Sequence, residues 1–85
     1  MIRVLFPTHL RSYLDGAAEV MAEGATVGEV LADVERRHRG FLIRVVDEQD
    51  RIRPHIKVFV GGELAADLHA PIVGDVQLIA ALSGG

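Results

Sequence analysis

A single helix among short strands is the feature that most limits the folds open to this chain. Residues 26–29 have the spacing of a capping box, in which a threonine hydroxyl and a glutamate carboxylate accept hydrogen bonds from backbone amides at a helix start. Apolar residues then recur at helical spacing, at Val27, Val30, Leu31 and Val34. Gly40 stands where a left-handed cap belongs. These signals predict an amphipathic helix over residues 27–39.

Runs of β-branched and aromatic residues lie on both sides of the predicted helix. We predict strands at residues 2–6, 18–23, 55–60, 63–64 and 75–80. Two other segments are less defined. The apolar run at residues 41–46 fits a buried strand and a buried irregular segment equally well, because periodicity cannot separate the two. Residues 65–71 can hold one helical turn.

These elements predict an α+β domain, since one helix is best buried by packing across one face of a sheet. If the first and last strands lie side by side and parallel at the centre, the architecture is a β-grasp, or ubiquitin-like, fold. We expect a mixed sheet of four to five strands with one main helix on one face. The predicted boundaries are residues 1–81 for the β-grasp domain and residues 82–85 for a flexible C-terminal tail.

Alternation along the strands divides the sheet into two faces, because successive side chains of a strand point to opposite sides. The side chains expected to face the helix are Ile2, Val4, Phe6, Ile56, Val58, Val60, Val76, Leu78 and Ala80. On the opposite face we expect an apolar stripe flanked by two cations. The stripe consists of Leu5, Phe59 and Ile79, and the cations are Arg3 and Lys57. Such a patch is typical of a protein-docking surface, although scattered exposed hydrophobes are also normal.

The chain ends in Leu82, Ser83, Gly84 and Gly85, directly after the last predicted strand. Glycine has no Cβ, so a Gly-Gly end can enter a narrow channel and let the backbone of a partner approach closely. A strand that leads straight into the tail would hold the terminal carboxylate on a short tether. The alternative is a frayed C-terminus without function, which is common at chain ends.

Composition argues against several classes of function. The net charge of −3 and the pI of about 5.7 do not favour nucleic-acid binding, which requires a basic patch. The chain has no cysteine, so thiol catalysis and cysteine-bound metal are excluded. Its 4 histidines lack the spacing of a metal site, and no segment approaches the roughly 20 apolar residues of a bilayer span. We therefore expect a cytoplasmic protein that is not an enzyme and binds no metal, nucleic acid or membrane.

Over all 85 residues, the chain resembles the MoaD/ThiS family of ubiquitin-like sulfur carrier proteins. The matching segments, in chain order, are the opening strand at residues 2–6, the helix start at residues 26–29, the Gly74-Asp75-Val76 entry to the last strand, and the closing residues 82–85. The segment at residues 7–11, followed by Asp15 and Gly16, is most similar to the branch that includes the cysteine-biosynthesis carrier.

The resemblance implies a reaction at Gly85. An E1-like adenylyltransferase, which uses ATP and magnesium in its own site, would join the Gly85 carboxylate to AMP. A sulfur donor would then displace AMP and leave a C-terminal thiocarboxylate, whose sulfur passes to a downstream sulfur-accepting synthase. In this scheme Gly84 gives access to the carboxylate, Leu82 and Ser83 position the tail, and the chain itself binds no cofactor.

Three alternatives stay open at the level of sequence. The chain can be the small subunit of a molybdopterin synthase, which uses the same activation step with a different acceptor. Thiolated tRNA and sulfur-containing natural products are further possible acceptors. It can be a modifier whose Gly85 is conjugated to lysines of other proteins. It can also be a ubiquitin-like docking module that binds through Leu5, Phe59 and Ile79 and whose Gly-Gly end is incidental.

Overall fold

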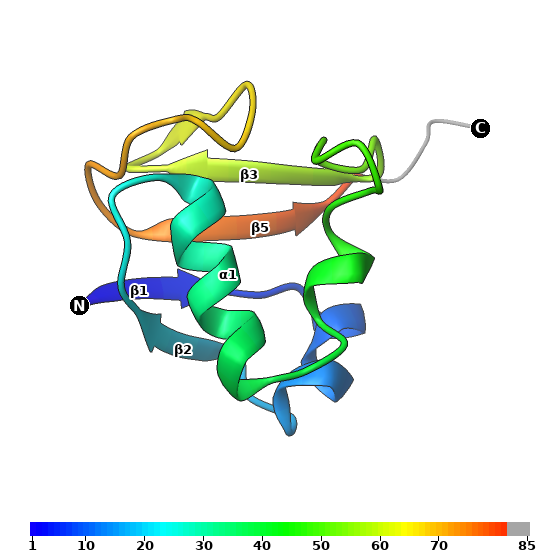
Figure 1. The fold of residues 1–85 in the computed structure, drawn as a ribbon. Helices are drawn as coiled ribbons and strands as arrows, with labels where there is room; N and C mark the ends of the chain where they lie inside the picture. Colours follow the sequence, from blue (N-terminus) through cyan, green and yellow to red (C-terminus); the bar gives the residue numbers. More distant parts are fainter. Residues whose placement is uncertain (82–85) are drawn as a thin grey trace.

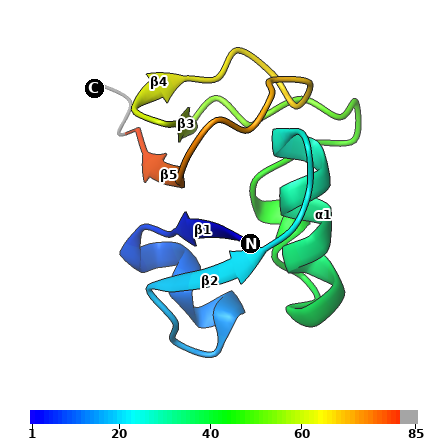
Figure 2. The same ribbon diagram turned by 90° about the vertical axis from the view of Figure 1, so that its left-hand side faces the viewer.

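A computed structural model describes residues 1–81 of the chain (Figure 1). Its elements, in order, are β1 (Ile2–Leu5), the 3₁₀ helix η1 (Thr8–Leu14), β2 (Glu19–Ala22), α1 (Val27–Arg37), the 3₁₀ turn η2 (Leu42–Arg44), β3 (Ile56–Val60), β4 (Glu63–Leu64) and β5 (Val76–Ala80). Figure 2 shows that α1 lies across one side of the sheet. The predicted tail at residues 82–85 lies outside the described residues.

The five strands form one mixed sheet with the order β2-β1-β5-β3-β4. The first and last strands are neighbours and run parallel, with Val4 beside Val76, whereas the other pairs are antiparallel. The predicted β-grasp fold is therefore confirmed. Its topology places β5, the strand that leads to the C-terminus, in the centre of the sheet.

The start of α1 follows the predicted capping box. The Thr26 hydroxyl accepts a hydrogen bond from the amide of Glu29 at 3.2 Å, and the Glu29 carboxylate accepts one from the amide of Ala25 at 2.9 Å. The helix ends at Arg37, two residues before the predicted end at residue 39. The cause is His38, which leaves the helical conformation (φ −134°), so that the chain turns before the positive φ of Gly40.

Three segments differ from, or add to, the sequence prediction. Residues 8–14, for which we predicted no element, form η1 and bury Leu10 and Leu14. Residues 41–46 are the irregular alternative, because η2 turns the chain while the flanking residues Phe41, Val45 and Val46 stay buried. Residues 65–71 contain a turn closed by the amide of Ala70 and the carbonyl of Asp67 at 3.4 Å, where a helical turn was predicted.

The core lies between the sheet and α1, as the alternation predicted. Of the residues predicted to face the helix, those that are at most 4% exposed are Val4, Phe6, Ile56, Val58, Val60, Val76 and Leu78. Ile2 and Ala80 are only half-buried because they lie at strand ends. Phe41, just before η2, also closes the core beside α1. Its ring packs edge-to-face on Phe6, with the ring centroids 5.4 Å apart.

Candidate functional site

The register of the sheet brings the predicted docking residues together on the face opposite α1. Leu5 lies beside Gln77, and Gln77 lies beside Phe59 on the next strand. Ile79 lies beside Lys57. We call this surface the open face; its members are Leu5, Gln77, Ile79, Lys57, Phe59 and Leu64. The predicted stripe therefore exists as a contiguous surface that crosses β1, β5 and β3.

The apolar side chains of the open face are unequally accessible. Ile79 is 39% exposed, whereas Leu5 and Phe59 are half-buried between their neighbours. Leu64, which the sequence analysis left out of the stripe, is 58% exposed and lies beside Phe59. The sequence signal that places Leu64 on this face is the Gly61-Gly62 pair, since such pairs form the tight two-residue turns that fix the register of a hairpin. In the structure both glycines have positive φ, as these turns require.

The two predicted cations have different surroundings. The Arg3 guanidinium lies 2.9 Å from the Asp75 carboxylate and 3.4 Å from the Glu19 carboxylate, so its charge is matched within the molecule. Lys57 is exposed and forms no ion pair with any residue from 1 to 81. Of the predicted pair, Lys57 is the cation whose charge is not matched by a residue from 1 to 81.

The strand β5 anchors the chain up to the start of the tail. It pairs with β3 along its whole length and with β1 through Val76 and Gln77. One residue further, the amide of Ala81 donates to the carbonyl of His55 at 2.8 Å. The predicted reacting residue Gly85 and its neighbours Leu82, Ser83 and Gly84 lie outside the described residues. The chain that leads into these residues is therefore held by β3 up to Ala81, whereas β1 pairs only with the first part of β5.

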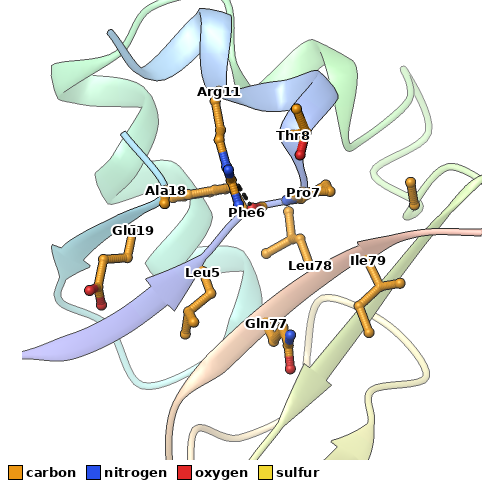
Figure 3. A pocket seen from close by; sticks show the side chains of 11 residues that line it. Leu5, Phe6, Pro7, Thr8, Arg11, Ala18, Glu19, Gln77, Leu78 and Ile79 are labelled. Carbon is orange, nitrogen blue, oxygen red and sulfur yellow. Dashed lines mark hydrogen bonds between the residues drawn. The ribbon is translucent and has the colours of Figure 1, made fainter. Parts of the chain in front are cut away.

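A hollow of about 450 Å³ lies beside the end of β5, between this strand, the end of β1 and the first turn of η1 (Figure 3). We call it the tail-side hollow. It is lined by Leu5, Phe6, Pro7, Thr8, Arg11, Ala18, Glu19, Gln77, Leu78, Ile79 and Ala80. Arg11 closes its upper rim by donating from Nε to the carbonyl of Phe6 at 3.2 Å. Sequence reasoning missed this hollow.

Three carboxyl groups with lowered pKa values lie away from the open face. Backbone amides are the main cause in each case: that of Glu23 lowers the pKa of Asp33, that of Leu42 lowers the pKa of Glu35, and that of Arg51 lowers the pKa of Asp47. These carboxylates hold loops and helix ends in place. Among residues 1–81, no three His, Asp or Glu side chains are grouped so as to hold a metal ion.

No helix in the described part of the chain is both long and apolar enough to cross a membrane.

Solved structures share both the fold and the length of this chain. The CysO chain of the Amycolatopsis orientalis BexX/CysO complex is 34% identical, with a TM-score of 0.90 and 100% of both chains covered. Mycobacterium tuberculosis CysO is 27% identical over 96% of this chain and 100% of that chain, with a TM-score of 0.89. SAMP1 from Haloferax volcanii is 28% identical over 99% of this chain and 98% of that chain, with a TM-score of 0.73.

No protein-family model and no curated protein matches the chain. The structural matches extend over the whole β-grasp domain and include proteins of the cysteine-biosynthesis branch that the sequence resembles. The chain belongs to the MoaD/ThiS family of ubiquitin-like sulfur carrier proteins.

Proposed function

We propose that this protein carries sulfur as a thiocarboxylate on its C-terminal glycine, Gly85. The observation that carries the proposal is the position of β5, which runs through the centre of the sheet and is held up to Ala81. Only four residues follow, and they end in Gly84 and Gly85. A rigid domain with a short, small-residue end can present its carboxylate inside the active site of another protein.

The chemistry proceeds in two displacements. The Gly85 carboxylate attacks the α-phosphorus of ATP in the site of an E1-like adenylyltransferase, which forms an acyl adenylate and releases pyrophosphate. Hydrosulfide, delivered by a sulfur donor, then attacks the carbonyl carbon and releases AMP. A carboxylate is a poor electrophile until a good leaving group is attached, so activation has to precede sulfur transfer. The resulting thiocarboxylate is a nucleophile that a downstream synthase can use.

The open face is the surface proposed to dock on these partners. Leu5, Phe59 and Ile79 supply apolar contacts there, and Lys57 supplies an exposed cation at the rim. Interfaces of this kind combine a small apolar centre with a polar rim. In this scheme ATP and magnesium belong to the partner, and the cycle takes place in the cytoplasm.

The proposed destination of the sulfur is cysteine. The support is the similarity to two proteins named CysO, one of them crystallised with BexX. Molybdopterin is the alternative destination, since the activation chemistry would be the same.

The test is the intact mass of the purified protein after incubation with ATP, sulfide and an E1-like adenylyltransferase from the same genome. We expect a mass gain equal to the replacement of one oxygen by sulfur, and no gain in a variant that lacks Gly85. An unchanged mass with several competent activating enzymes would overturn the carrier proposal.

A second candidate is protein modification, in which the activated Gly85 forms an isopeptide bond with a lysine of another protein. It is favoured by the similarity to SAMP1, a protein named as a small archaeal modifier. Lys57 is the sole lysine of this chain, so self-conjugation has a single possible site. Covalent adducts that appear in cell extracts and disappear when Gly85 is deleted would establish this second role.

A further inference from the structure

The strand β5 has one edge that its neighbours cover only in part. In an antiparallel ladder, alternate residues direct their backbone groups toward the same neighbour. The carbonyl of Asp75 accepts from Gly61 at 2.9 Å, and the amide of Ala81 donates to His55 at 2.8 Å, so the odd-numbered residues of β5 face β3. The even-numbered residues, Val76, Leu78 and Ala80, therefore face β1.

The strand β1 reaches only the first part of this edge. Its last pair with β5 joins Leu5 to Gln77, and the next residue of the chain with backbone groups on that side is Pro7, beyond the end of β1. Pro7 has an extended conformation (φ −70°, ψ 160°), but proline has no amide to donate, and the chain enters η1 at Thr8. The β1–β5 ladder ends here.

Three backbone groups of β5 are left facing the tail-side hollow. They are the carbonyl of Leu78 and both the amide and the carbonyl of Ala80. No backbone or side-chain group of residues 1–81 forms a hydrogen bond with any of them. An unpaired strand edge of this kind is a template for an added strand. The hollow beside it is the space that one more strand would occupy.

We propose that the tail-side hollow receives one short extended segment of the enzyme that activates Gly85, and that this segment pairs with Leu78 and Ala80. The segment would take the place that β1 leaves at Pro7. It would accept from the amide of Ala80 and donate to the carbonyls of Leu78 and Ala80. The identity of this partner rests on the proposed function, whereas the evidence for an unpaired edge on β5 is independent of it.

The length of the tail determines which protein can be the occupant. Four residues follow Ala81, and a fully extended chain of four residues spans at most about 14 Å. A pocket that receives Gly85 must therefore open within that distance of Ala81, which brings the surface of the activating enzyme to the end of β5. The tail-side hollow lies at that end and lies against β5 itself.

The hollow is also continuous with the open face. Leu5, Gln77 and Ile79 belong to both surfaces (Figure 3). Side chains of an added strand would alternate, so that one set would extend over Leu5 and Ile79. An apolar residue fits on that side of the segment. The segment would thus enlarge the proposed docking surface by backbone pairing.

Amide hydrogen exchange, followed by NMR on the ¹⁵N-labelled protein, tests the proposal. In the free protein we expect the Ala80 amide to exchange at least about 100-fold faster than that of Ile79, which is bonded within the β3–β5 ladder. In the complex with the E1-like adenylyltransferase, the Ala80 amide should slow by at least about tenfold. Strong protection of Ala80 in the free protein, or none in the saturated complex, would overturn the proposal.

A pair of proline variants separates this edge from general stability. Ala80→Pro removes the proposed donor and places the ring in the hollow, and we expect it to weaken binding to the adenylyltransferase by about tenfold or more. Ala65→Pro is the matched control. It removes the amide of Ala65, which donates to the carbonyl of Val58 at 2.8 Å at the opposite edge of the sheet, just after β4. It should lose stability but keep its affinity within about threefold.

The same assay distinguishes a failure of this proposal from a failure of the proposed function. If wild-type protein gains sulfur while Ala80→Pro and Ala65→Pro bind the enzyme equally well, the carrier function stands and the added strand is wrong. If wild-type protein binds the enzyme, with Ala80 protected, but gains no sulfur, the added strand stands and the carrier function is wrong.

Discussion

The two faces of the sheet are built from alternate residues of the same strands, yet they differ sharply in burial. On β5, Val76 and Leu78 are buried beneath α1, whereas Gln77 and Ile79 lie on the open face. The closed face contains the interior apolar residues of β1, β3 and β5, and its packing determines the fold. The open face keeps apolar side chains that no described element covers. In this protein the two-residue period of a strand separates residues that stabilise the fold from residues of the proposed docking surface.

The strongest test of this division compares two adjacent residues of β5. Leu78 is 2% exposed and Ile79 is 39% exposed. Leu78→Ala should lower the free energy of unfolding by about 3 kcal/mol, because it removes apolar contacts and leaves a cavity. Ile79→Ala should lower it by at most about 1 kcal/mol, the range of strand propensity at an exposed site. Urea unfolding followed by circular dichroism measures both values.

Equal losses of stability in the two variants would contradict the division. Ile56→Val and Lys57→Ala on β3 provide a second comparison, because Ile56 is 1% exposed and Lys57 is exposed. The first removes one buried methylene group and should cost about 1 kcal/mol, while the second should change stability by less than about 0.5 kcal/mol.

The next test reverses the comparison by measuring binding. Ile79→Asp places a charge in the middle of the proposed docking surface and should weaken affinity for the E1-like adenylyltransferase by about tenfold or more. Met21→Asp is the matched control, because Met21 is 44% exposed on the same side of the sheet but lies on the edge strand β2 beside Arg3. Isothermal titration calorimetry gives both affinities. Equal affinity losses would mean that the open face has no defined docking centre.

Local signals explain how much of the fold could be predicted from the sequence. The capping box at residues 26–29 and the alternation from Ile56 to Val60 each act within one element, so the helix, the strands and the two faces followed from them. The 3₁₀ helix η1 did not. Leu10 and Leu14 alone suggest a turn of helix, and their conformation depends on a core that other segments complete.

In the candidate site, too, only the features that depend on local sequence could be predicted. Leu5, Phe59 and Ile79 were placed together by alternation, which is local. The pairing of Arg3 with Asp75 spans 72 residues and depends on the parallel register of β1 and β5, so no local pattern indicates that the charge of Arg3 is matched. The tail-side hollow arises where β1 diverges from β5 at Pro7, and such a divergence depends on the path of the chain in space.

The helix α1, which covers the closed face, contains a carboxylate, Glu35, that makes stability depend on pH. The amides of Leu42 and Gly40 donate to Glu35 at 2.8 and 3.1 Å, and the first of them is the main cause of its lowered pKa. A carboxyl group whose pKa is lowered in the folded state stabilises the protein at pH values above its ordinary pKa, which is 4.5 for glutamate. That stability is lost as the pH falls through the lowered pKa, because the unfolded state binds the proton more tightly.

Glu35→Gln should therefore lower the free energy of unfolding by about 1 kcal/mol near neutral pH and by clearly less at about pH 3. Urea unfolding at the two pH values measures the difference. Glu63→Gln on β4 is the control, since the Glu63 carboxylate forms no hydrogen bond or ion pair with residues 1–81, and it should change stability little at either pH. A loss for Glu35→Gln that is the same at both pH values would contradict the role of its charge.

The smallest expected effect concerns the cluster of Arg3, Glu19 and Asp75 beside the open face. Arg3 and Asp75 are 48% and 55% exposed in their side chains, so water and salt screen their attraction. A double-mutant cycle with Arg3→Ala and Asp75→Ala should give a coupling energy of about 0.5 kcal/mol or less, measured by urea unfolding. A coupling above about 1.5 kcal/mol would mean that this side of the sheet also stabilises the fold. A small coupling would instead leave Arg3 able to exchange Asp75 for a carboxylate of a partner at little cost, because the bond it gives up contributes little to folding.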